Sequence, residues 1–189
     1  LPSLSNAANT FGLYLDGLAS GATIYHNNIY FRAAGNNAGF TAYGLYLKSS
    51  AKLNFDHNRI SHPGLATAGS VVSAYFAGAT QTAFSFNDVN STGTGLFNAY
   101  NLQLVNPTVT VKNNIFLSSW QVTNAMADLN ANNLSGLDSD FNTWFSSNSL
   151  SLTWGPNYAT LSAFQAATGE DVSSLPLNPQ WFNPALGAE

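Results

Sequence analysis

The sequence has no cysteine, very few charged residues and no long apolar run. Without cysteine the chain can form neither disulfides nor thiolate metal sites. No apolar stretch approaches the roughly 20 residues that a membrane-spanning helix needs. Only 5 Lys and Arg stand against 9 Asp and Glu, and no basic stripe is present to neutralise phosphates. We therefore expect neither a membrane span nor nucleic acid as a partner.

The residues that are abundant favour an ordered core with an uncharged polar surface. Apolar residues make up 45% of the chain and aromatic residues 13%, which is enough to bury a core. The polarity comes from 24 asparagines and many serines and threonines rather than from charge. Amides and hydroxyls can stack on copies of themselves, whereas like charges at strand spacing repel each other.

Asparagine recurs about once every 30 residues. The recurring positions are Asn27, Asn58, Asn87, Asn113 and Asn142, spaced 31, 29, 26 and 29 residues apart. A large apolar residue stands two positions after each of these asparagines. A repeat of this length without a helical period predicts a coil of short strands in which each turn stacks on the last.

Aligning the turns on these asparagines predicts which residues face inward. Ile24, Phe55 and Phe84 share one inward column. In the fourth turn the apolar alternation falls on Val109 and Val111, one residue out of step, so we expect a bulge there.

Two further strands are expected in each turn. Residues 12–15 repeat as residues 44–47, which predicts a strand upstream of each asparagine, and a short strand such as residues 29–31 follows it. Segments rich in Gly, Asn and Ser at residues 33–39, 91–95 and 130–136 are typical of turns or loops.

The C-terminal stretch differs from the repeat. Thr160 is a candidate N-cap of a helix over residues 161–168, with Gly169 at its C-terminal end and Leu161, Phe164 and Ala167 as its apolar stripe. Prolines and aromatic residues follow, which suits a plug over the open end of the core. Residues 1–10 contain no comparable cap.

Residues 25–29, 57–60 and 111–115, with the tail from Tyr158 to Pro184, resemble the right-handed parallel β-helix family of secreted bacterial proteins with pectate-lyase-like turns. The resemblance implies an all-β, right-handed parallel β-helix of about five coils with a short C-terminal helix and capping segment. It implies one domain over residues 1–189, with coils over about 11–150 and a cap over about 151–189, belonging to a longer product. This family contains lyases, glycosidases, adhesins and phage spikes.

Three columns carry polar side chains. The asparagine column predicts a ladder in which each amide bonds the next at about 4.8 Å spacing. Beside it, a column of Asn28, Arg59, Asp88, Asn114 and Thr143 places Arg59 next to Asp88 as an ion pair. A third column contains His26, His57, Phe86, Lys112 and Phe141, for which a stacked imidazole pair is a better interpretation than a metal site.

Only a few of the carboxylates in the sequence are candidates for catalysis. Asp138 and Asp140 lie two residues apart, as a glycosidase pair could, but turn chemistry is the more common use of such residues. Glu170 and Asp171 are expected to be solvated, and Asp128 is isolated.

Outward tyrosines are the better functional clue. Tyr14 and Tyr46 repeat in register and Tyr25 is expected to point outward, so these three are possible ligand-binding residues. The alternative is that a loop such as residues 32–40 covers them.

We expect a non-catalytic structural or adhesive module of a secreted or cell-surface protein, extracellular in location, that assembles end to end into a fibre. The alternatives are a polysaccharide lyase or glycoside hydrolase, or a non-catalytic carbohydrate-binding module. No metal or cofactor is expected, and the expected partners are copies of the chain, neighbouring segments of the same protein or a polysaccharide.

Overall fold

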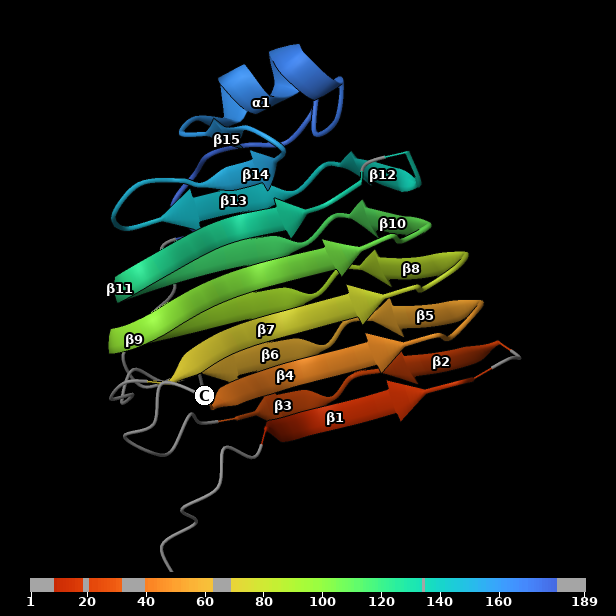
Figure 1. Ribbon diagram of the computed structural model, residues 1–189. Coiled ribbons are helices and arrows are strands. Elements are labelled where there is room, and N and C mark those ends of the chain that lie inside the picture. The colour runs from red at the N-terminus through yellow and green to blue at the C-terminus, as the bar shows by residue number, and fades with distance from the viewer. Residues whose placement is uncertain (1–8, 19–20, 32–39, 63–68, 134, 180–189) are drawn as a thin grey trace, which may run out of the picture.

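The computed structural model describes residues 9–18, 21–31, 40–62, 69–133 and 135–179. The chain is a right-handed parallel β-helix in which strands from successive turns lie side by side (Figure 1). Five strands stack in the smaller sheet, so the coil completes about four turns where about five were expected. The expected fold class is confirmed. Among the described residues, no helix combines the length and apolar character that crossing a membrane requires.

The strands fall into two stacks, parallel throughout except where β15 pairs antiparallel with β14. The larger sheet contains β1 (Thr10–Asp16), β4 (Thr41–Lys48), β7 (Ser70–Ala77), β9 (Asp88–Val105), β11 (Ile115–Ala131) and β14 (Leu152–Trp154) in that order, followed by β15 (Asn157–Tyr158). It also takes in β3 (Asn28–Tyr30), β6 (Arg59–His62) and β13 (Thr143–Ser146). The smaller sheet stacks β2 (Ala22–Tyr25), β5 (Leu53–Asp56), β8 (Thr82–Ser85), β10 (Val109–Lys112) and β12 (Leu137–Asp140).

The expected strand positions agree with the structure except at two expected loops. In the loop expected at residues 130–136, the first two residues belong to β11 instead. Leu13 pairs with Leu45 and Tyr14 with Tyr46, as the repeat predicts. The expected loop at residues 91–95 is wrong, because β9 and β11 run as strands of 18 and 17 residues that pair with each other. The expected loop at residues 33–39 lies outside the described residues.

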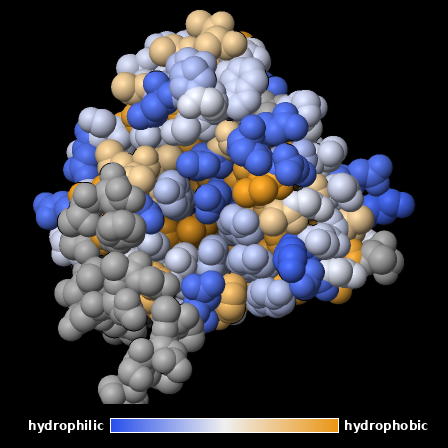
Figure 2. All heavy atoms as spheres, viewed as in Figure 1, coloured by the Kyte–Doolittle hydropathy of each residue, from blue (hydrophilic) through white to orange (hydrophobic). Residues whose placement is uncertain are grey.

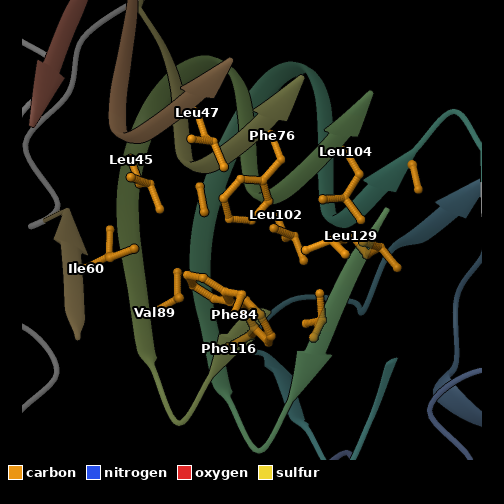
Figure 3. Packing of buried hydrophobic residues seen from close by; sticks show 14 of the residues in the cluster. Leu45, Leu47, Ile60, Phe76, Phe84, Val89, Leu102, Leu104, Phe116 and Leu129 are labelled. Atoms are coloured by element: carbon orange, nitrogen blue, oxygen red, sulfur yellow. The ribbon is translucent and has the colours of Figure 1, made fainter. Parts of the chain in front are cut away.

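Apolar side chains from both stacks fill the inside of the coil (Figure 3). Ile24 pairs with Phe55 and Phe55 with Phe84, so the expected inward column is confirmed. Phe84, Phe116 and Trp144 continue the aromatic packing, and the last two rings stack with centroids 4.1 Å apart. Burying such rings stabilises a stack of turns that no single turn could form alone.

The helix α1 (Leu161–Thr168) lies over the C-terminal end of the coil (Figure 1). The Thr160 side chain accepts a hydrogen bond from the Ala163 N–H, and Gly169 has the left-handed conformation (φ 77°) of a C-terminal cap. Leu161 and Phe164 are buried as expected, whereas Ala167 is exposed. The predicted helix and both of its caps are therefore confirmed.

Candidate functional site

A continuous ladder of asparagine amides runs through the corner that follows the smaller sheet. It joins Asn27, Asn58, Asn87, Asn114 and Asn142. In every ladder residue after Asn27, the Oδ1 accepts two hydrogen bonds of 2.9–3.1 Å from the preceding ladder residue, one from its backbone N–H and one from its Nδ2. From Asn58 onward each Nδ2 also donates to a carbonyl of the preceding turn. The buried amides thus satisfy one another and the backbone.

The fourth member of the ladder is Asn114, so the expectation of Asn113 is wrong. Val111 pairs with Phe84, and Ile115 pairs with Asp88, which places the fourth turn in the same phase as the others. The bulge expected there is absent from the described pairing for the same reason. Asn113 instead takes the corner position with φ 58°, a left-handed conformation that asparagine tolerates better than most residues.

In the two neighbouring columns, the fourth-turn residue likewise lies one position further along the chain than expected. His26, His57, Phe86, Asn113 and Phe141 form the corner column, all with φ between 52° and 58°, and Lys112 does not belong to it. The His57 and Phe86 rings stack at 5.2 Å, while His26 meets His57 edge to face. In the adjacent column Arg59 pairs in register with Asp88, and Ile115 takes the place expected for Asn114.

A shallow groove of about 380 Å³ runs beside this corner. We call it the corner groove, and its lining includes His26, Asn28, His57, Arg59, Phe86 and Asp88. Burial raises the pKa of Asp88 above its ordinary value, and the charges of Arg59 and His57 partly oppose that shift. The groove therefore combines a guanidinium group, a half-buried carboxyl group and two imidazoles.

The second candidate site is an outward cluster of rings on the larger sheet, which we call the aromatic face. It consists of Phe11, Tyr14, Tyr43, Tyr46 and Tyr75 from β1, β4 and β7. The stacked pairs are Tyr14 on Tyr46 (5.1 Å), Tyr46 on Tyr75 (4.8 Å) and Phe11 on Tyr43 (5.3 Å). Figure 2 views the side on which β1, β4 and β7 lie, and shows a mosaic of hydrophilic and apolar residues there.

The backbone explains why rings three residues apart share this face. Gly44 and Leu45 are both buried, between Tyr43 and Tyr46, which are both partly exposed. A Cβ on Gly44 would come within 2.6 Å of Ile60 Cγ2 and 2.7 Å of Phe31 Cε1, so position 44 points inward like Leu45. Two successive inward residues therefore break the usual alternation and bring Tyr43 next to Tyr46, at 4.9 Å.

Charged and phenolic groups border the aromatic face. Tyr14 donates a 3.0 Å hydrogen bond to Asp16 Oδ2, and Lys48 Nζ lies 3.8 Å from the same oxygen. The bond to Asp16 raises the pKa of Tyr14, and burial raises the pKa of Tyr43 and Tyr75. These phenols therefore remain neutral hydrogen-bonding groups at physiological pH.

The structure brings Tyr14 and Tyr46 together but places Tyr25 elsewhere. Tyr25 belongs to β2 of the smaller sheet, where its ring contacts His26 at 5.3 Å. It is 60% exposed. Tyr25 is therefore a separate surface residue, and Tyr43 and Tyr75, which the sequence repeat did not single out, complete the aromatic face.

The paired carboxylates of β12 are engaged by other groups. Asp138 Oδ1 lies 2.7 Å from Lys112 Nζ. Asp140 Oδ1 accepts hydrogen bonds from the backbone N–H of Phe141 and of Ser173, and these bonds lower its pKa. Both side chains thus fasten turns and the cap, which is a structural use of the pair.

Sequence reasoning missed two buried carboxylates. Asp171, expected to be solvated, is fully buried and its Oδ1 accepts from Asn142 Nδ2, Trp144 Nε1 and Ser174 Oγ. Asp128 is 2% exposed, and its carboxylate accepts from Ser118 Oγ at 2.5 Å and from the Ser151 N–H at 2.9 Å. Neither residue has a sequence motif that marks burial, although each lies near serines that donate to it.

Asp128 ends an inward column that becomes larger and more polar along the coil. Gly12, Gly44, Ser73, Asn101 and Asp128 each precede one of the aligned residues Leu13, Leu45, Ala74, Leu102 and Leu129. Both amide atoms of Asn101 and the Ser73 hydroxyl are buried without a hydrogen-bond partner among the described residues. From Ser73 onward this column forms a buried polar strip in the described interior, in addition to the asparagine ladder.

The described residues contain no group of three or more His, Cys, Asp or Glu side chains placed to hold a metal ion. Comparison of the chain with protein-family models, with curated proteins and with solved structures found no match.

Proposed function

We propose that this chain is a non-catalytic structural and adhesive module of a secreted or cell-surface protein, and that it contacts a polysaccharide through the aromatic face. The observation that carries the proposal is the contact of five outward rings from three successive turns. The proposal includes the relationship to pectate-lyase-like β-helices that the sequence motifs suggested.

The rings are arranged to present both apolar edges and hydroxyl groups. Because Tyr46 stacks between Tyr14 and Tyr75, part of each ring face is covered by a neighbour and the edges point outward. Neutral phenols along such a ridge can donate to sugar hydroxyls while the ring edges contact apolar C–H groups. Asp16 and Lys48 add charged hydrogen-bonding groups at one border.

The test is binding of the whole chain to a panel of insoluble and soluble polysaccharides, measured by co-sedimentation and on a glycan array. The double variant Tyr46→Ala/Tyr75→Ala should weaken binding at least about tenfold, equivalent to about 1.4 kcal/mol. Tyr25→Ala is the matched control, since it removes an exposed tyrosine from the other sheet.

Two outcomes would overturn the proposal. One is the absence of binding to any member of the panel, and the other is equal weakening by Tyr25→Ala and by the double variant. Tyr14→Phe separates a binding effect from a loss of stability, because it keeps the ring stack and removes only the hydroxyl that bonds Asp16.

The alternative, a polysaccharide lyase or glycoside hydrolase, is favoured by one observation, the corner groove. Asp88 has a raised pKa there and lies in register with Arg59, as an acid beside a charge-stabilising group would. Release of reducing ends from a polysaccharide panel, abolished by Asp88→Asn and by Arg59→Ala, would establish this activity. Asp138 and Asp140 offer less support because Lys112 and the cap backbone engage them.

A further inference from the structure

We propose that the N-terminal end of the coil is a docking surface for another winding of parallel β-helix, supplied by a different β-helical segment. This inference rests on the end of the coil and is independent of the polysaccharide proposal.

The first winding exposes side chains whose counterparts in the second winding are buried. Leu13 and Leu15 are partly exposed, whereas their partners Leu45 and Leu47 are fully buried. The same difference holds between Ile24, partly exposed, and Phe55, 1% exposed. Another winding laid on this end would bury the same columns and remove their apolar surface from water.

The strand edges of the first winding are also available. Within the described residues, β1, β2 and β3 pair only with the strands of the second winding, β4, β5 and β6. A groove of about 300 Å³ at this end is lined by Gly12, Leu13, Asn27, Asn28, Ile29 and Tyr30. An incoming parallel strand would pair with these edges, as in recognition by strand addition.

The direction of the asparagine ladder identifies the kind of winding that fits. Every described ladder residue after the first uses its Oδ1 to accept from the winding before it. Asn27 Oδ1 accepts no hydrogen bond from a described residue, while its N–H and Nδ2 already donate to Asn58. The partner therefore has to supply donors at this corner, as a winding with its own asparagine would.

A second copy of this chain does not meet that requirement. Its C-terminal end is covered by α1, and there Asp171 and Ser174 already accept from the last ladder residue, Asn142. Its N-terminal end offers another Asn27 whose donors are already used. The geometry thus favours a non-identical β-helical segment over head-to-tail fibres of this chain.

The experiment adds such a winding to the full chain. A second copy of residues 41–69 is inserted between residues 8 and 9, so that Asn9 follows it as Ser70 follows residue 69 in the native chain. Hydrogen exchange should slow at least about tenfold at the amides of β1, β2 and β3 that point to the open end. The control inserts the same residues in shuffled order, and a further variant carries Asn58→Ala in the added copy only.

The results of the insertion experiment distinguish a docking surface from a nonspecific effect of the insert. Protection of β1, β2 and β3 by the native-order insert but not by the shuffled one supports the docking surface. A smaller gain with Asn58→Ala in the added copy supports the role of Asn27 as the acceptor. If the native-order insert leaves these amides as fast as in the parent chain, or protects them no better than the shuffled insert, the proposal is wrong.

Discussion

Ser118 and Asp128 lie ten residues apart in one strand, β11, yet their side chains meet inside the coil with an Oγ–Oδ1 distance of 2.5 Å. The contact is possible because the pairing of β11 with β9 shifts register between Gln121 and Ala125, where the strand turns the corner of the coil. One carboxylate thereby links two sides of the same winding, and Ser151 joins it from the next.

This contact predicts how stability depends on pH. Burial raises the pKa of Asp128 from 3.8 to about 6 in the folded chain. Near pH 4 and below, the group is protonated when folded, and this contribution to stability is lost as the pH rises through about 6. The free energy of unfolding should therefore fall by about 2 kcal/mol from this group alone between pH 4 and pH 7.

Asp128→Asn isolates the effect, since the amide cannot ionise. Denaturant titrations at several pH values should give a stability difference between the variant and the parent chain that grows toward neutral pH. A difference that stays constant from pH 4 to pH 8 would contradict the assignment.

Because Asn87 belongs to the ladder and Asn113 does not, Asn87→Ala and Asn113→Ala should lower the free energy of unfolding by unequal amounts. Asn87 is fully buried, and its removal leaves the Asn58 N–H and the Phe55 carbonyl without their partners. We expect a loss of about 3 kcal/mol for Asn87→Ala and about 1 kcal/mol or less for Asn113→Ala. Equal losses in urea unfolding would contradict the observed register.

The contacts of Asp171 in the cap predict that its removal strongly destabilises the fold. Its carboxylate accepts from four side-chain donors of the last winding and the cap, including Ser139 Oγ. Asp171→Ala should cost about 3–5 kcal/mol, because several buried donors lose their acceptor together. Hydrogen exchange should accelerate first in β12, β13 and α1.

Asp138→Ala is the matched control for that variant. Its carboxylate is largely exposed and pairs only with Lys112 among the described residues, so the expected cost is about 1 kcal/mol or less. Equal acceleration of exchange in both variants would contradict a specific role for Asp171.

The close packing around Gly44 predicts that a larger residue at this position destabilises the fold. A Cβ at this position would lie 2.6 Å from the Ser73 carbonyl oxygen and from Ile60 Cγ2, closer than a real contact allows. We expect Gly44→Ala to cost about 2–3 kcal/mol through displacement of the neighbouring winding. A melting temperature within one degree of the parent chain would show that position 44 does not point inward.

The fold could be predicted because its determinants repeat in the sequence. Each winding repeats the same amide and the same inward apolar residues, as at Asn27 and Asn58, so one alignment revealed the stack. The prediction of the fourth ladder residue was wrong because Asn113 and Asn114 are adjacent and spacing alone does not distinguish them. The phase of Val109 and Val111 contained the answer, since it agrees with Asn114 and with no bulge.

The candidate sites were predicted only in part, for a physical reason. Tyr14 and Tyr46 were found because they repeat at one spacing, whereas Tyr43 joins them through a local break in strand alternation that no residue type announces. The burial of Asp128 and Asp171 depends mainly on donors 10 to 32 residues away, such as Ser118 and Ser139, with Ser174 the one nearby donor named above. Such contacts are set by the completed stack and leave no local pattern.

From Gly44 onward, the inward column that ends at Asp128 gives each layer a different residue. These layers differ here in side-chain volume and polarity, and the layer of Gly44 has no room for a larger side chain, since a Cβ there would lie 2.6 Å from Ile60 Cγ2. A chain threaded one layer out of place would separate Asp128 from the Ser151 N–H of the next winding, which donates to its carboxylate. Assembly errors of this kind are therefore penalised.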